Sequence, residues 1–205
     1  MNPTAPIGRE WGDLLNGPGV PGDAAERLSR FLDLLLRWGG ATDLFGAADP
    51  GGLLDALVRD TLAALPWVPP SGRLVDVGSG NGFPAVPLLI ARPGLHGVLL
   101  EPRERRWAFL KEAARESGLD AEVRRERVEE HRGSGYKVGT VRGVEAAAWA
   151  AAVPRLLAAD GTWLWWTSAA KAGELERRAS GGRVVTFALP CEGHGTLAVW
   201  ERRST

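Results

Sequence analysis

Three glycines and an acid lie close together in the segment Val75-Asp-Val-Gly-Ser-Gly-Asn-Gly-Phe-Pro84, which joins an apolar run to a helix-like segment. Glycines let the backbone turn sharply and let a ligand approach the main chain, and the N-terminus of the following helix supplies free N–H groups. In a dinucleotide fingerprint the third glycine comes three residues after the second, whereas Gly82 comes two residues after Gly80. The spacing therefore predicts a ligand-binding turn but disfavours a dinucleotide as its ligand.

Two carboxylates narrow the chemistry of this ligand. Asp76 stands at the mouth of the turn, where its charge would repel a pyrophosphate but would suit the ammonium group, or a bound water, of an amino-acid moiety. Glu101 ends the next apolar run, where an acid can accept both hydroxyls of an adenosine ribose. A helix cap for Asp76 and a solvated surface charge for Glu101 are the alternatives. The pair favours S-adenosylmethionine over a nicotinamide cofactor. The cofactor residues predicted on this basis are Asp76, Gly78, Ser79, Gly80, Gly82 and Glu101.

Composition limits the other kinds of site. Cys191 is the single cysteine, which excludes an internal disulfide and a cysteine-based zinc site and fits a reducing compartment. Lys plus Arg and Asp plus Glu each total 25, so a nucleic-acid partner would have to be held by a local basic patch. The run from Arg103 to Arg106, with Lys111 and Arg115 beyond it, could form such a rim. The acids interleaved with it make a solvated helix face an equally good interpretation.

Helical patterns fill the first part of the chain. Asp23-Ala-Ala-Glu26 is a capping-box pattern, and Leu28, Phe31, Leu32 and Leu35 follow at spacings that place them on one face. A second amphipathic pattern follows Asp49-Pro50 and ends at Pro66. Two such helices could bury little surface alone. We therefore expect residues 1–70 to form a helical extension packed on a core domain of residues 71–205.

From Arg73 onward, short apolar runs alternate with helical segments, which is typical of βαβ units and a mostly parallel sheet. Helices are expected to start near Pro84, Arg103, Glu145 and Lys171. The expected strands are Leu74 to Val77, Val98 to Leu100, one near Val123, Val138 to Val141, Thr162 to Thr167, Arg183 to Ala188 and Thr196 to Arg202. The last two have no helix between them and predict an antiparallel hairpin. The fold class is therefore α/β, a Rossmann-like class I methyltransferase fold with a seven-stranded sheet, in which Trp163, Trp165 and Trp166 pack in the core.

The distribution of apolar residues bears on localisation. No segment reaches ~18 uninterrupted apolar residues, so no membrane span is expected. Residues 1–20 lack the basic start and apolar stretch of a signal peptide. We expect a cytoplasmic protein that acts as a monomer, with no metal and no membrane partner.

The motifs resemble those of the bacterial small-subunit ribosomal RNA guanine-N7 methyltransferases, the glucose-inhibited division protein B family. The prolines of Gly82-Phe-Pro84, Pro87 and Arg92-Pro93 make the likeness specific, because most methyltransferases share only the glycines. The resemblance is carried by Leu74-Val-Asp-Val-Gly-Ser-Gly-Asn-Gly-Phe-Pro-Ala-Val-Pro-Leu88, Ala91-Arg-Pro93, Leu99-Leu-Glu101, Arg105-Arg106 with Phe109-Leu110, and Arg127-Val-Glu-Glu130.

This resemblance implies roles for several residues. Gly78 and Phe83 would contact S-adenosylmethionine, Val128 and Glu129 would flank its adenine, and Arg142 would border both the cofactor and the substrate. The implied partner is ribosomal RNA or the small ribosomal subunit. Methyl transfer to guanine N7 needs no general base, so we expect only positioning residues. Candidates for positioning or substrate contact are Arg142, Lys171, Arg59, Asp60 and His194.

Several segments depart from the family pattern. They are Asp43-Leu-Phe45, Leu57-Val-Arg-Asp-Thr61, Val141-Arg-Gly-Val-Glu145 and Ala170-Lys-Ala172. Because these segments are expected to face RNA, a divergent paralogue that methylates another RNA or a small molecule is one alternative. A non-catalytic binding module is a second, and a dinucleotide oxidoreductase is a remote third.

Overall fold

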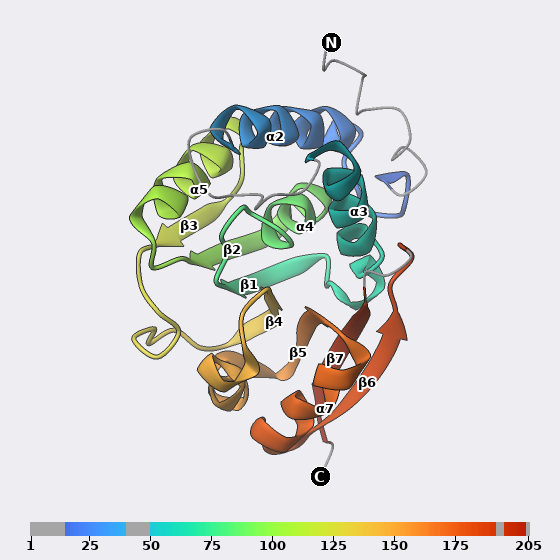
Figure 1. Cartoon of the computed structure of the whole chain (residues 1–205), viewed down its shortest axis with the longest axis vertical. Helices are drawn as coiled ribbons and strands as arrows, with labels where there is room; N and C mark the ends of the chain where they lie inside the picture. The colour runs from blue at the N-terminus through green and yellow to red at the C-terminus, as the bar shows by residue number, and fades with distance from the viewer. Residues whose placement is uncertain (1–14, 40–49, 192–194, 204–205) are drawn as a thin grey trace.

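The structure is a computed structural model that describes residues 15–39, 50–191 and 195–203 (Figure 1). The segments Asp43-Leu-Phe45 and Asp49, and the candidate residue His194, lie outside the described residues. Within the described residues, no helix combines the length and the apolar character that a membrane span requires.

A seven-stranded sheet runs through the middle of the molecule in the order β3-β2-β1-β4-β5-β7-β6. Strands β1 to β5 pair in parallel, whereas β7 is antiparallel to both β5 and β6. The predicted sheet and its terminal hairpin are confirmed. The bounds are β1 Ser71–Val77, β2 Gly94–Leu100, β3 Ala121–Arg124, β4 Tyr136–Arg142, β5 Leu157–Thr167, β6 Gly182–Ala188 and β7 Thr196–Arg202.

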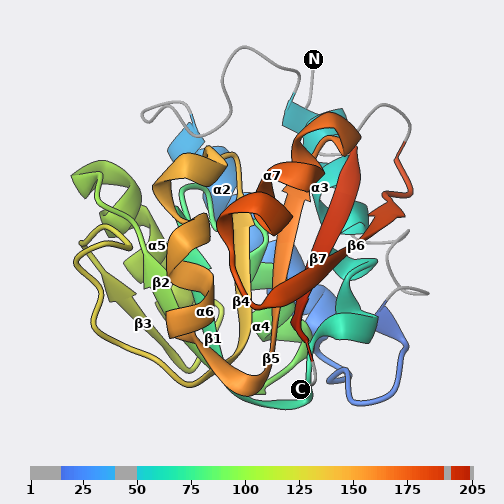
Figure 2. The same ribbon diagram turned by 90° about the horizontal axis from the view of Figure 1, so that it is seen from below.

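Helices cover both faces of the sheet, as Figures 1 and 2 show. One layer contains α2 Ala24–Gly39, α3 Pro50–Leu62, α4 Ala85–Ala91 and α5 Glu104–Glu116, with the short 3₁₀ helix η1 Leu65–Trp67. The other contains η2 Ala146–Ala148, η3 Ala150–Ala152, α6 Val153–Leu156 and α7 Ala169–Arg178. Each layer has its own hydrophobic cluster against the sheet. Both faces are therefore covered, as a parallel sheet requires.

The N-terminal helix α2 packs directly behind the glycine turn. Its Phe31 is fully buried, with ring centroids 5.5 Å from Phe83 and 6.4 Å from Phe109. The Arg27 guanidinium donates hydrogen bonds of 2.9 Å to the carbonyls of Ser117 and Gly118, just after α5. The apolar face predicted from the capping-box pattern is thus buried against α4 and α5.

The segment after β4 differs from the single helix predicted near Glu145. It forms two 3₁₀ turns and then the one-turn helix α6. Trp149 explains the break, because its ring stacks on Trp163 at 5.3 Å and meets Trp165 edge-on at 5.1 Å. Burial of this indole takes precedence over the helix propensity of the alanines around it. The predicted core role of Trp163, Trp165 and Trp166 is confirmed, since each is at most 4% exposed.

Candidate cofactor and substrate site

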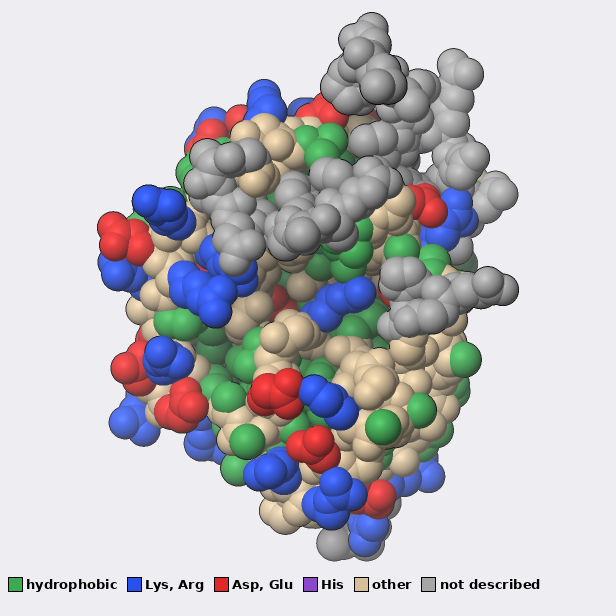
Figure 3. All heavy atoms as spheres, viewed as in Figure 1, with side chains coloured by type: hydrophobic (Ala, Val, Ile, Leu, Met, Phe, Trp, Pro, Cys, Tyr) green, Lys and Arg blue, Asp and Glu red, His purple; other side chains and the backbone are tan. Residues whose placement is uncertain are grey.

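A cavity of about 660 Å³ opens beyond the carboxyl ends of β1, β2 and β4, a size that suits a small-molecule ligand. Figure 3 shows a hollow on this face, with basic and acidic side chains gathered around it. Ligands of open α/β sheets bind at this edge. The lining residues are Leu57, Val77, Gly78, Gly80, Asn81, Phe83, Leu100, Glu101, Pro102, Arg103, Arg106, Glu126, Arg127, Val128, Glu129, Arg142, Gly143, Val144, Glu145 and Ala148.

The glycine turn is anchored to the end of β2. The backbone N–H groups of Gly78 and Ser79 both donate to the Leu100 carbonyl, at 2.9 and 3.1 Å. Gly78, Gly80 and Gly82 have positive φ values of 70°, 48° and 89°, a region that L side chains rarely adopt. The turn therefore has a fixed shape that depends on glycine at all three positions.

Each glycine leaves space for a different neighbour. A Cβ on Gly78 would lie 2.5 Å from the Val144 side chain, and one on Gly82 would lie 2.9 Å from the Phe31 ring. A Cβ on Gly80 would instead meet only ordinary contacts, 3.5 Å from Arg106 Nη1 and 3.9 Å from Glu101 Oε2, two residues that line the cavity. Gly80 keeps the ligand space open, whereas Gly82 and Ser79 lie behind the cavity wall and hold the turn in place.

Glu101 lies on the cavity wall and connects the turn to α5. It is 3% exposed, and its carboxylate accepts the Gly80 N–H at 3.0 Å and the Arg103 N–H at 2.8 Å. Two backbone donors hold the carboxylate in a single orientation. Its remaining lone pairs can accept ligand hydroxyls from the cavity.

Asp76 lies behind the turn, 1% exposed and outside the cavity lining. The Thr140 hydroxyl donates to its Oδ1 at 2.6 Å, while Oδ2 has no hydrogen-bond partner within the described part of the chain. Burial raises the pKa of Asp76 to about 6, although the hydrogen bonds from Thr140 and Ser79 counteract this shift. Asp76 therefore lies behind the turn rather than on the cavity wall, with both carboxylate oxygens in the interior.

The segment after β3 forms the opposite wall. Val128 is 5% exposed and packs into the cluster beneath α6 and α7, yet it also lines the cavity. Glu129 is exposed at the rim. With Phe83 and Leu100, Val128 gives the cavity an apolar surface that an adenine ring could contact.

Arg142 ends β4 at the cavity and is only partly exposed. Burial lowers its pKa, and the attraction of the Asp60 carboxylate raises it in part. Its Nη1 atom has no hydrogen-bond partner among residues 15–39, 50–191 and 195–203. Because Nη1 is itself buried, Arg142 lies at the cavity with a guanidinium that the described protein satisfies only in part.

Asp60 lies in the interior, 0% exposed, and not on the cavity wall. Its Oδ1 accepts the Cys191 N–H at 3.4 Å, and its carbonyl accepts the Trp166 indole N–H at 3.0 Å. The expectation that Asp60 contacts a substrate does not fit this position. Its carboxylate instead ties the hairpin loop between β6 and β7 to α3 and lies close enough to Arg142 to raise its pKa.

The remaining substrate candidates lie around the cavity rather than in it. Arg59 forms an ion pair with Asp55 at 2.8 Å and is not part of the lining. Lys171 at the start of α7 pairs with Glu145 at 2.8 Å, and Glu145 does line the cavity. Lys171 thus reaches the rim through its partner.

Some lining residues were not predicted individually: Leu57 and Val144 belong to segments expected to face RNA, and Glu126 was not proposed for the site. Arg103 and Arg106 of the basic run do line the cavity, whereas Lys111 lies over the Trp107 ring and Arg115 pairs with Glu112. The basic run therefore splits into a cavity rim and a solvated face. Most of the other lining residues follow the carboxyl end of a parallel strand, and this position is the signal that could have identified them. The described residues contain no group of three His, Cys, Asp or Glu side chains that could hold a metal ion.

The family model for rRNA small subunit methyltransferase G, also called GidB, matches residues 24–184. The chain belongs to this family. The resemblance drawn from the proline-rich motif is confirmed. The matched residues include the glycine turn, Glu101 and the segment after β3.

Two relatives carry the same name as the family model. A protein named ribosomal RNA small subunit methyltransferase G in Alkalilimnicola ehrlichii is 43% identical over 103 residues, which are 50% of this chain and 46% of that protein. The protein of the same name in Halorhodospira halophila is 38% identical over 143 residues, which are 69% of this chain and 68% of that protein. The chain thus spans about half the length of the first relative and two thirds of the second.

Solved structures support the fold class. A SAM-dependent methyltransferase from Aquifex aeolicus superposes with a TM-score of 0.60 at 16% sequence identity, covering 75% of this chain and 93% of that chain. At this identity the similarity concerns the fold alone. The fold is that of the class I methyltransferases, as predicted.

Proposed function

We propose that this chain is an S-adenosylmethionine-dependent methyltransferase that transfers a methyl group to N7 of a guanine in small-subunit ribosomal RNA. The observation that carries the proposal is the joint position of the Gly78–Gly80 turn and Glu101 on one wall of the cavity, in a member of this family. The proposed partner is ribosomal RNA or the assembled small subunit, met in the cytoplasm by a monomer.

The residues fit this cofactor. The space left by the missing side chain of Gly80 adjoins Glu101 Oε2, where a ribose would lie, and Val128 and Phe83 supply apolar surface for adenine. Gly78, Val128, Glu129 and Arg142 complete the proposed cofactor contacts. When bound, S-adenosylmethionine supplies a methyl group already activated on its sulfonium.

The protein's own contribution is orientation. Guanine N7 has a free lone pair, so no side chain has to remove a proton from it. Holding N7 in line with the methyl group can lower the barrier by ~7–11 kcal/mol. Arg142 is the first positioning candidate, because it lines the cavity at the end of β4 and a guanidinium can donate to guanine O6 and leave N7 open. Lys171 could bind a neighbouring phosphate after exchange with Glu145.

A different target is the second candidate. The altered family segment Val141-Arg-Gly-Val-Glu145 lies at the cavity, since Arg142 through Glu145 line it. A changed wall on the substrate side would change which nucleotide or molecule fits. The unaltered cofactor side argues against a non-catalytic binding module.

The test is transfer of tritiated methyl groups from S-adenosylmethionine to small ribosomal subunits and to deproteinised 16S RNA, followed by nucleoside analysis. The proposal predicts label in 7-methylguanosine, with a rate reduced at least tenfold by Arg142→Ala and unchanged by Arg177→Ala, an exposed residue outside the cavity. Label in another nucleoside or in a small-molecule acceptor would support the second candidate. Absence of transfer to any RNA would contradict the proposal.

A further inference from the structure

The connection from β3 to β4, residues 125–135, contains no helix. Parallel strands are usually joined through a helix that packs on the sheet, whose own hydrogen bonds fix its shape. Here four consecutive residues of the connection, Glu126, Arg127, Val128 and Glu129, line the cavity. A single turn, in which the N–H groups of Glu130 and His131 donate to the Arg127 carbonyl at 3.1 and 3.2 Å, holds part of this wall, and side-chain contacts must fix the rest.

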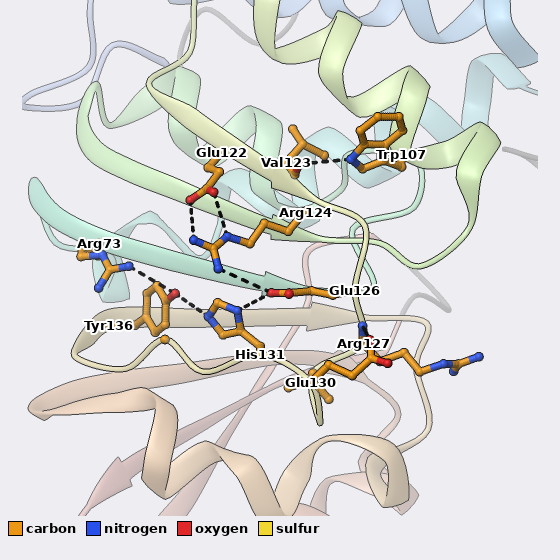
Figure 4. Close-up of polar contacts among 12 residues, drawn as sticks. Arg73, Trp107, Glu122, Val123, Arg124, Glu126, Arg127, Glu130, His131 and Tyr136 are labelled. Carbon is orange, nitrogen blue, oxygen red and sulfur yellow. Dashed lines mark hydrogen bonds and ion pairs between the residues drawn. The ribbon is translucent and has the colours of Figure 1, made fainter.

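His131 supplies such contacts from beneath the wall (Figure 4). Its side chain is 1% exposed, its Nδ1 lies 2.6 Å from Glu126 Oε1, and its Nε2 lies 2.7 Å from the Tyr136 hydroxyl. An ionised carboxylate only accepts hydrogen bonds, so Nδ1 carries the proton that Glu126 receives. In the neutral ring, Nε2 then accepts the Tyr136 O–H. The result is a chain of hydrogen bonds from β4 through His131 to a residue of the cavity wall.

The residues around His131 leave room for these hydrogen bonds and add charged contacts to them. A Cβ on Gly133 would lie 2.4 Å from His131 Nε2 and 2.5 Å from the Tyr136 hydroxyl, so glycine is needed there for space. Arg73 of β1 lies over the Tyr136 ring, 4.6 Å from its centroid, and Arg124 Nη1 lies 3.8 Å from Glu126 Oε1. The cluster of Arg73, Arg124, Glu126, His131 and Tyr136 therefore ties the wall to three strands, β1, β3 and β4.

We propose that His131 is a positioning residue for the adenosine end of the cofactor: its ring, held by Tyr136, fixes Glu126 and with it the wall from Glu126 to Glu129. His131 does not line the cavity, so it acts only through this wall. The inference rests on the proposed function, since it takes the cavity to hold S-adenosylmethionine.

The experiment compares binding of S-adenosylhomocysteine and of 5′-methylthioadenosine by calorimetry. Both probes contain adenosine, but only the first contains the amino acid. His131→Phe keeps a ring but makes no hydrogen bond. It should raise the Kd of both probes by the same factor, about tenfold, because both contain adenosine. His131→Asn, whose amide can donate near the position of Nδ1, should restore part of the affinity. Irreversibly unfolded protein would lower the number of sites per chain and leave Kd unchanged, and a thermal unfolding curve shows that the variant is folded at the temperature of the titration.

His96→Phe is the matched control. His96 also pairs with a carboxylate, with Nδ1 2.9 Å from Asp120 Oδ1, but its side chain is 40% exposed and lies outside the cavity lining. Its Kd values should equal those of the parent. In the methyl-transfer assay, His131→Phe should raise the KM for S-adenosylmethionine while the KM for RNA and kcat stay within about twofold.

Two outcomes would overturn the inference, and they differ from failure of the proposed function. Parental Kd values in His131→Phe would show that the wall does not depend on this ring. Unchanged amide hydrogen exchange of residues 125–135 in that variant would show the same without any ligand. If the parent itself binds neither probe, the proposed function fails, and the exchange measurement still tests the wall.

Discussion

Asp76 and Glu101 end adjacent strands and yet have different environments. Glu101 accepts two backbone N–H groups and faces the cavity, whereas Asp76 is buried with one oxygen unpartnered in the described structure. From their positions at strand ends, the sequence predicted that both acids contact the ligand. It could not predict which one reaches the ligand, because that depends on the path of the turn in front of Asp76.

The buried carboxyl of Asp76 gives a pH prediction with a definite sign. Its pKa rises from 3.8 to about 6 on folding, so the folded protein keeps a proton that the unfolded chain has lost. The stabilisation that this bound proton provides is complete below the unfolded pKa of 3.8 and is lost as the pH rises to the folded pKa of about 6. Relative to Asp76→Asn, the parent should therefore lose about 3 kcal/mol of unfolding free energy across this window, as an upper value. Urea unfolding at several pH values measures it.

Asp160→Asn is the control for this prediction. Asp160 is exposed, and its hydrogen bond with Lys137 lowers its pKa, so any contribution has the opposite sign. The unfolding free energy of the parent, measured relative to Asp160→Asn, should therefore not fall between pH 4 and 6. Parallel pH curves for the parent and Asp76→Asn would contradict a raised pKa at Asp76.

At the scale of elements, the spacing of apolar residues predicted the strands and helices whose formation depends on local sequence. The alternation of apolar runs located all seven strands, and the capping-box pattern located α2. The helix expected after Glu145 was wrong because Trp149 is buried against Trp163, a contact between distant elements. The cavity wall after β3 was predicted only through the family resemblance, since an irregular connection has no period. The boundary at residue 70 stays a prediction.

Helix α2 should stabilise the cofactor turn through Phe31. Its ring fills the space left by Gly82 and contacts Phe83, which lines the cavity. Phe31→Ala should cost roughly 3–5 kcal/mol of unfolding free energy and should weaken S-adenosylhomocysteine binding in the fraction that stays folded. Leu36→Ala on the same helix, where the side chain is only partly buried, should cost distinctly less. Equal losses in the two variants would argue against a special role for Phe31.

At the scale of the whole molecule, charge balance leaves RNA binding to local groups. The formal net charge is zero, but Arg103 and Arg127 line the cavity with exposed side chains, and no described acid forms an ion pair with either guanidinium. Under the proposed function, these two exposed arginines on the cavity rim are the groups that we expect to contact RNA phosphates. Overall composition could not reveal this, because it averages over the surface.

RNA affinity should therefore depend on salt through these arginines. Each of Arg103→Ala and Arg127→Ala should lower the slope of log affinity against log salt by about 0.7 to 1, the loss expected for one phosphate contact. Filter binding with 16S RNA at several salt concentrations measures the slope. Arg177→Ala on α7, also exposed but outside the cavity lining, should leave it unchanged. Equal slopes in the parent and both rim variants would exclude these residues from the RNA interface.

Calorimetric titration with S-adenosylhomocysteine tests most directly whether the cavity beside the glycine turn binds S-adenosylmethionine through Glu101, as proposed. The parent should bind one equivalent, and Glu101→Ala should bind at least tenfold more weakly, because the carboxylate that accepts the ribose hydroxyls and orients the turn is gone. Lack of binding by the parent, or equal binding by parent and variant, would contradict the account.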